Sequence, residues 1–203
     1  MARLPVEERR RLLIAAAARV MARDGIAATS TRAITTEADM PRGSFHYCFR
    51  SKDELLGELA ATVVSDMVQA ARAAWSPDVP LDRNLRSGLR AVWEAGSRHP
   101  DEHLVAYELT TYALHDSERA QLARRQYDSY YQQGADYLAF VAENAGIEWT
   151  LPMPTLARLL VTVIDGLFLN WLPDRDTEAA TDVLDAFADQ LAALAKPPPT
   201  GRR

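Results

Sequence analysis

Residues 25–52 constrain the fold of this 203-residue chain more than any other segment. Two short helical stretches lie on either side of a turn at Asp39, and small residues surround that turn. Apolar side chains at Ile34, Phe45 and Phe49 can anchor the two helices, which must cross steeply around a small core.

Helical periodicity extends over the rest of the chain and predicts an all-α fold with about nine helices. Glycine is scarce, with 9 residues, and alternating runs of β-branched residues are missing, so strands are not expected. Ser30 or Thr31 can cap the second helix, and Ser51 with Glu54 makes a capping box for the fourth. Besides two short helices after residues 30 and 41, we expect helices near residues 6–23, 51–75, 81–98, 101–115, 117–145, 153–172 and 176–195.

Charge is distributed unevenly along the chain. The formal net charge is −5, which taken alone argues against a nucleic-acid partner. Residues 1–52, however, hold ten Lys and Arg against five Asp and Glu, whereas the remainder holds 13 against 23. A basic head on an acidic body can attract phosphate groups at one end while the chain stays soluble. A chance fluctuation of charge is the alternative interpretation.

The pattern of residues 9–56 resembles the helix-turn-helix of the TetR (tetracycline-repressor) family; beyond residue 56 only the number and length of the helices agree. The resemblance rests on small, polar, aromatic and basic residues at Ala15, Ala16, Gly25, Ser30, Thr31, Arg32, Ile34, Ala38, Gly43, the cluster 45–49, Ser51, Lys52, Leu55 and Leu56. Three positions depart from the usual pattern. Asp39 replaces a glycine, so the resemblance implies a left-handed backbone conformation at Asp39, which aspartate tolerates better than most residues. Pro41 replaces a serine cap, and His46 replaces a tyrosine.

The resemblance implies a double-stranded DNA partner, whose major groove would accept the helix that follows residue 41. It implies that Thr31 and Arg32 contact the sugar-phosphate backbone of the DNA and that Lys52 contacts a DNA phosphate. The outer side of the third helix would face the groove with Arg42, Gly43, Ser44, His46 and Tyr47. Either His46 or Tyr47 would take the phosphate contact of the usual tyrosine. Ordinary solvated surface is the alternative for each of these residues.

The resemblance also implies two domains and a homodimer. Residues 1–50 would form the helix-turn-helix DNA-binding domain and residues 51–196 the ligand-binding and dimerisation domain, while residues 197–203 would be a disordered tail. The helix near 153–172 is apolar almost all round, which predicts burial on more than one side. TetR-like proteins pair their last two helices, which predicts an interface that includes Leu160, Ile164, Leu167, Val183, Phe187 and Leu191. A wholly intramolecular core is the alternative.

Aromatic residues crowd the middle of the chain among a few polar groups, a composition typical of small-molecule sites. We expect an unknown effector to bind among Tyr107, Glu108, Thr111, Tyr127 and Phe168. A buried carboxylate at Glu108 would be costly unless a cation on the ligand or an internal partner such as Arg124 or Arg158 offset it. The effector is therefore expected to be small and partly apolar, with cations among the candidates. The alternative is that the tyrosines are simply core residues.

These observations predict a cytoplasmic, ligand-responsive transcriptional regulator. A repressor is favoured, released from a palindromic operator when a small molecule binds the C-terminal domain. An enzyme is not expected, because the chain lacks a phosphate loop, a dinucleotide glycine motif, a zinc helix motif and a nucleophile elbow. A helical adaptor that binds a protein partner in its aromatic groove is the remaining alternative.

Cofactors, metals and membranes are not expected as partners. Pro100 separates His99 from His103, and no third metal ligand is evident. The most apolar run, 156–172, contains Arg158 and two further polar residues, so we expect no membrane-spanning segment. The N-terminus lacks the apolar core of a secretory signal, and a single cysteine suits a reducing compartment.

Overall fold

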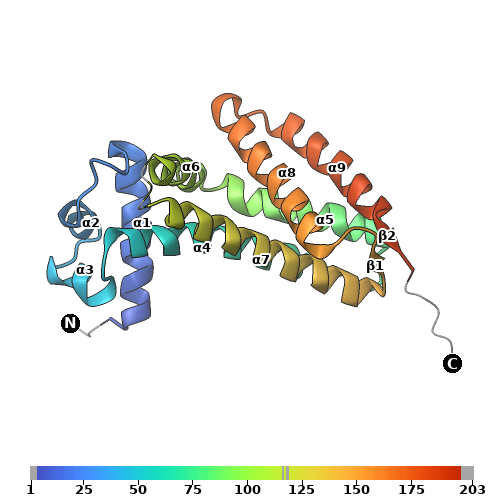
Figure 1. Cartoon of the computed structure of the whole chain (residues 1–203), viewed down its shortest axis with the longest axis horizontal. Helices are drawn as coiled ribbons and strands as arrows, with labels where there is room; N and C mark the ends of the chain where they lie inside the picture. The colour runs from blue at the N-terminus through green and yellow to red at the C-terminus, as the bar shows by residue number, and fades with distance from the viewer. Residues whose placement is uncertain (1–3, 116, 118, 198–203) are drawn as a thin grey trace. The chain divides into compact units, whose positions relative to one another are not determined.

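The computed structural model of the chain describes residues 4–115, 117 and 119–197. Within these residues it contains nine α-helices and one pair of two-residue strands (Figure 1). In chain order the elements are α1 (Val6–Asp24), α2 (Thr31–Glu37), α3 (Gly43–Cys48), α4 (Lys52–Ala73), α5 (Leu81–Ser97), α6 (Pro100–Leu114), α7 (Ala120–Ala145), β1 (Glu148–Trp149), α8 (Met153–Asp174), α9 (Thr177–Ala193) and β2 (Ala195–Lys196). The predicted all-α class is confirmed. Of the predicted tail, 197–203, all but Pro197 lies outside the described residues.

The short strands are a departure from the sequence-based expectation. β1 pairs antiparallel with β2, so that Glu148 lies opposite Lys196 and Trp149 lies opposite Ala195. The Trp149 indole also donates a hydrogen bond to the Leu138 carbonyl at 3.0 Å. Two residues are too few for a period-two pattern to be recognisable. This pairing connects the segment after α7 to the segment after α9.

The chain divides into two compact units that do not follow the order of the sequence. One unit comprises Met1–Val63 with His99–Asp128, and the other comprises Val64–Arg98 with Ser129–Arg203. Helices α4 and α7 contribute to both units, whereas α6 lies wholly in the first. The resemblance placed a domain boundary at residue 50, because a local motif cannot reveal that a distant helix packs with the N-terminal segment. The assignment of residues 51–196 to ligand binding and dimerisation stays a prediction.

In the first unit, α2, α3 and α6 pack against α1. Helix α1 presents a face of small and medium apolar residues to them, and its fully or almost fully buried members are Leu13, Ala16, Ala17, Ala18, Val20 and Met21. The three predicted anchors of the helix-turn-helix, Ile34, Phe45 and Phe49, are at most 1% exposed. Their role in the small core is therefore confirmed.

In the second unit, α5 packs along α9, and α8 lies beside α9 (Figure 1). Arginines of α5 form salt bridges with aspartates of α9: Arg90 with Asp185 at 2.6 Å, and Arg86 with Asp189 at 2.6 Å. Trp93 of α5 stacks on Phe168 of α8, with ring centroids 4.9 Å apart. The aromatic side chains that the sequence places in this region thus form a packed cluster.

Helix α8 is more apolar than the sequence analysis allowed. The helix has 22 residues, and its most apolar 18-residue window has a mean hydropathy of 1.4. By length and composition it could therefore cross a membrane. The charged residues Arg158 and Asp165 therefore do not make this helix too polar by composition alone, and the expectation of no membrane-spanning segment stays a prediction. One such helix does not indicate a membrane protein, because a helix covered by other helices has the same composition.

Candidate DNA-binding surface

Helix α2 begins at a side-chain cap and is followed by a left-handed turn. The Ser30 hydroxyl oxygen accepts a hydrogen bond from the Ala33 amide at 3.2 Å, so Ser30, one of the two predicted caps, is the cap of α2. The backbone then turns at Asp39, whose φ of 51° lies in the left-handed region. The Met40 amide donates to the Thr35 carbonyl at 2.9 Å across this turn. The prediction for Asp39 is confirmed, and the turn allows α3 to begin four residues later.

Helix α3 buries one face and exposes the other. Phe45 and Cys48 lie in the core, whereas Tyr47 is 55% exposed. The predicted groove-facing residues that are exposed are Arg42, Gly43, His46 and Tyr47. Ser44 is half-buried and its amide donates to the Pro41 carbonyl at 2.9 Å. The exposed face therefore lacks aliphatic side chains and presents hydrogen-bonding groups, as a helix in the major groove requires.

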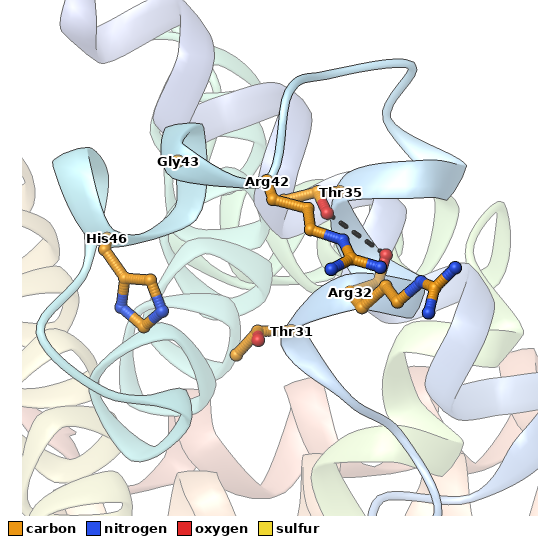
Figure 2. Close-up of a pocket in the computed structure, with 6 residues that line it drawn as sticks. All are labelled: Thr31, Arg32, Thr35, Arg42, Gly43 and His46. Atoms are coloured by element: carbon orange, nitrogen blue, oxygen red, sulfur yellow. Dashed lines mark hydrogen bonds between the residues drawn. The ribbon is translucent and has the colours of Figure 1, made fainter.

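A surface hollow of about 320 Å³ lies between α2 and α3 and is lined by Thr31, Arg32, Thr35, Arg42, Gly43 and His46. Figure 2 shows the Arg42 side chain extending toward α2, with the His46 ring on the α3 side of the hollow. Thr35 was missed in the sequence analysis, although it lies one helical turn after Thr31. Its hydroxyl donates to the Arg32 carbonyl at 3.1 Å, so its own helix already occupies it.

The two arginines of this hollow keep their charge available. Among the described residues, neither Arg32 nor Arg42 forms a salt bridge, whereas some other arginines of this unit do, such as Arg11 with Glu8. Arg19 lies 2.8 Å from a carboxylate oxygen of Glu37, and its guanidinium holds the pKa of Glu37 below the usual value. Positive charge that no carboxylate neutralises is what a phosphate backbone attracts.

The Lys52 ammonium has two partners within the chain. Its Nζ donates hydrogen bonds to the carbonyl oxygens of Ile26 at 2.8 Å and Thr29 at 3.2 Å. Burial lowers the pKa of the Lys52 ammonium below its usual value. A phosphate would have to compete with two internal acceptors, so this geometry disfavours the predicted contact. A motif assigns a role by position in the sequence and cannot reveal which atoms a side chain contacts.

Two family models match the chain. The model described as "Bacterial regulatory proteins, tetR family" matches residues 13–59, and the model described as "BetI-type transcriptional repressor, C-terminal" matches residues 81–196. The second match alone covers more than half of the chain. The chain belongs to the TetR family. All eight predicted DNA contacts, from Thr31 to Lys52, lie within the first match.

Individual relatives agree with this assignment. The chain is 25% identical over 193 residues to the HTH-type nicotine-responsive transcriptional repressor of Paenarthrobacter nicotinovorans, covering 93% of this chain and 98% of the relative. A Syntrophomonas wolfei structure described as a TetR-family regulator has a TM-score of 0.74 at 14% identity, covering 92% of this chain and 96% of that one. One from Rhodococcus sp. has a TM-score of 0.76 at 19% identity, covering 92% and 99%. These two likenesses concern the fold.

The TetR-family assignment establishes DNA binding and regulation of transcription as the activity. The helix-turn-helix made by α2 and α3 is the DNA-binding element of the family. Repressors that respond to a ligand are typical of this family, whereas enzymes are not. The residues that contact an effector or a second subunit need separate consideration.

Two of the predicted effector contacts in the TetR-family regulator have other roles. The Glu108 carboxylate accepts a hydrogen bond from the Ile26 amide at 2.7 Å, so the unpaired buried charge that motivated the prediction does not exist. Thr111 is exposed, and its hydroxyl donates to the Glu108 carbonyl of its own helix at 3.0 Å. Tyr107 and Tyr127 belong to the first unit and are half-buried, whereas Phe168 is a buried residue of the second.

The predicted dimer contacts also need correction. Leu191 is fully buried within the chain itself, and Leu160, Leu167 and Phe187 are at most 9% exposed. These four side chains belong to the intramolecular core, because the other helices of the chain already cover them. Ile164 is half-buried and Val183 is 49% exposed. Periodicity identified the apolar faces of α8 and α9, but it could not distinguish which apolar residues face inward.

Proposed function

We propose that this TetR-family regulator is a cytoplasmic repressor that binds a palindromic operator as a homodimer and releases it when a small molecule binds the C-terminal region. The observation that best supports this proposal is the hollow between α2 and α3, because its two guanidinium groups form no salt bridge among the described residues and can attract DNA phosphates. The repressor function of the relative from Paenarthrobacter nicotinovorans supports the direction of regulation.

We assign the exposed face of α3 to the major groove. Arg42 and His46 offer donors to base edges, and an arginine can pair with a guanine through two parallel hydrogen bonds. Thr31 and Arg32, at the start of α2, are assigned to the phosphate backbone, where they would set the register of α3 in the groove. The exposed Tyr47 ring completes this surface, with the Arg9 guanidinium 4.8 Å from its centroid.

A binding titration tests this assignment. Labelled DNA from upstream of the protein's own gene is titrated with the full-length protein at several salt concentrations, and fluorescence anisotropy measures the affinity. Arg42→Ala should weaken binding about tenfold through loss of one charged contact. Arg83→Ala, an exposed arginine of α5, is the matched control and should leave the affinity unchanged. Equal effects of the two changes would contradict the assigned surface.

The homodimer is proposed from an apolar surface that the single chain leaves uncovered. Only 33% of the most apolar window of α8 is buried. Leu159 and Leu169 of α8 and Val183 of α9 are 37%, 54% and 49% exposed. A two-fold interface over these residues would cover them and give two α3 helices, one for each half-site of a palindrome.

The effector is proposed to be a small organic amine. The relative from Paenarthrobacter nicotinovorans responds to nicotine, which is an amine, and faces of tryptophan rings attract cations. In the second unit, Trp93, Phe168 and Trp171 form such an aromatic cluster. The buried Trp93 Nε1 has no acceptor among the described residues, and an acceptor on a ligand would satisfy it.

Thermal stabilisation tests the effector class. The melting temperature of the full-length protein is measured with nicotine and with a panel of amines and uncharged isosteres, and the same compounds are added to the protein–DNA complex. An amine that raises the melting temperature and releases DNA supports the proposal. If only uncharged compounds act, the amine class is wrong, and if none acts, ligand control is rejected.

A further inference from the structure

Helices α4 and α6 both bind the turn that joins α1 to α2. The Ile26 amide donates to Glu108 Oε1 of α6 at 2.7 Å. The Ile26 carbonyl accepts from Lys52 Nζ of α4 at 2.8 Å, and the same ammonium donates to the Thr29 carbonyl at 3.2 Å. One buried residue, Ile26, is therefore held through both of its backbone polar groups. We call Lys52, Glu108 and the turn 25–29 the Ile26 clamp.

The clamp lies directly before the DNA-binding helices. Thr29 precedes Ser30, the cap of α2, and the Thr29 hydroxyl donates back to the Gly25 carbonyl at 2.7 Å. The position of this turn therefore sets where α2 begins, and α2 packs with α3. A shift of the turn by a fraction of an ångström would move the base-reading face of α3, and hydrogen bonds to DNA depend steeply on such distances.

Gly25 is suited to the approach of Glu108. Its φ of +82° is unfavourable for residues with a side chain, and a Cβ there would lie 3.3 Å from Glu108 Oε1. Charged partners strengthen hydrogen bonds to backbone groups. The two charges of the clamp also attract each other, since Glu108 acts on Lys52 electrostatically. The clamp is therefore a built arrangement of a glycine, a carboxylate and an ammonium.

We propose that Lys52 and Glu108 are positioning residues for DNA binding, which act through Ile26, and that the Lys52 ammonium does not contact phosphate. This inference rests on the proposed function for the importance of DNA affinity, but the clamp itself exists in the free protein. It reverses the role that the resemblance assigned to Lys52. It also gives α6, which follows α2 by more than sixty residues in the sequence, a direct hydrogen bond to the turn that precedes the helix-turn-helix.

The wild-type protein allows the first test, because the chain has two lysines, Lys52 and Lys196. The Lys196 side chain is 52% exposed and serves as the internal control. Reductive methylation of the full-length free protein, followed by peptide mass spectrometry, measures the modification rate of each amine. We expect Lys52 to react at least tenfold more slowly than Lys196 without DNA, since its nitrogen is bound to two carbonyls. Equal rates in the free protein would overturn the clamp.

Variants provide the second test, on the dependence of DNA affinity on salt. A phosphate contact contributes a slope of about 0.9 to the plot of log affinity against log salt concentration. Lys52→Met should weaken DNA binding about tenfold, as expected for loss of charged hydrogen bonds, while leaving this slope unchanged. Arg32→Ala is the matched control, whose slope should fall. If the slope of Lys52→Met falls by as much, Lys52 contacts phosphate and the inference is wrong.

Glu108 gives the third test, which separates positioning from general stability. Glu108→Gln keeps an oxygen that can accept the Ile26 amide and should stay within about twofold of wild-type affinity, whereas Glu108→Ala should lose about tenfold. In the Lys52→Met, Glu108→Ala double variant the losses should be less than additive, because both act on the same turn. Additive losses, or equal effects of Gln and Ala, would contradict the clamp. Absence of DNA binding by the wild type would reject the proposed function while leaving the methylation test valid.

Discussion

The surface formed by α2 and α3 and the surface formed by α8 and α9 differ in what they leave without a partner. The α2–α3 surface exposes Arg32 and Arg42, which have no salt bridge among the described residues. The α8–α9 surface exposes apolar side chains, of which Leu169 is 54% and Val183 is 49% exposed. Two arginines of the second unit, in contrast, form salt bridges with aspartates: Arg90 with Asp185 at 2.6 Å and Arg86 with Asp189 at 2.6 Å.

This difference indicates the partner of each surface. Unpaired guanidinium groups gain most from phosphates and base edges, whereas exposed leucine and valine gain most from another apolar surface. The distribution of charge along the chain supports the same division, because the basic excess lies within residues 1–52. One chain thus carries two surfaces of opposite chemistry, and each can be altered without changing the other.

The largest expected effect is loss of the dimer when charges are placed on the apolar α8–α9 surface. Replacing Leu169 and Val183 together by glutamate places two like charges on the proposed interface, and the dimer should dissociate at micromolar concentration, measured by light scattering. Binding to a palindromic operator should fall with it, since both half-sites must be occupied. Leu114→Glu, at the 64% exposed end of α6, is the control. A dimer that persists in the double variant would exclude this face.

The next effect concerns the stability of the protein when Gly25, in the turn between α1 and α2, is replaced. Gly25→Ala places a Cβ at a φ of +82° and 3.3 Å from Glu108 Oε1, and should lower the free energy of unfolding by about 2 kcal/mol. Gly146→Ala is the matched control, because Gly146 has a φ of +62° but no neighbour within 4 Å. Denaturant titration of both variants should show the larger loss for Gly25, whose φ of 82° with ψ of 156° is a conformation nearly restricted to glycine and whose Cβ would meet Glu108. Equal losses would contradict this expectation.

A smaller effect compares a free arginine with a paired one. Arg32→Ala should weaken DNA binding by about tenfold and lower the salt slope by about 0.9 without changing the melting temperature. Arg90→Ala should leave DNA binding unchanged and lower stability by less than about 1 kcal/mol, because its salt bridge is exposed. Anisotropy and thermal melts of the two variants measure both quantities. The comparison fails if both variants lose DNA affinity.

The smallest effect concerns pH. Arg90 holds the pKa of Asp185 below its ordinary value, so the folded state binds a proton there less readily than the unfolded chain. The stabilisation is therefore present above the unfolded pKa, about 3.9, and is lost as pH falls through the lower folded value. Asp185→Asn should melt slightly below the wild type at neutral pH, and the difference should vanish in acid. A constant difference at all pH values would contradict this assignment.

Local sequence signals predicted local structure well. Ser30 as a cap, Asp39 in a left-handed turn, and Ile34, Phe45 and Phe49 as anchors are all confirmed. Each of these depends on neighbours within a few residues, and capping, turn conformation and helical periodicity are short-range effects. The motif within residues 25–52 was therefore sufficient to identify the helix-turn-helix.

The residues whose predicted roles the packing disfavours share a different property. Lys52, Glu108 and Leu191 were given roles from the resemblance, from composition and from periodicity, but each has partners that depend on packing between distant segments. Lys52 and Glu108 meet at Ile26, and Leu191 is covered by its own chain. A side chain with a charge or an apolar stripe has several possible partners, and only the fold brings one of them within reach.

The sequence by itself determined the helices, their ends, the helix-turn-helix and the uneven charge, because these follow from short-range preferences and composition. The tertiary structure decided which arginines stay unpaired, which apolar residues of α8 and α9 stay exposed, and that α6 packs with α1. These depend on contacts between residues far apart in the sequence, whose free energies exist only once the chain is folded. A surface that can bind a partner consists of the groups that intramolecular contacts leave exposed, so only the folded structure identifies it.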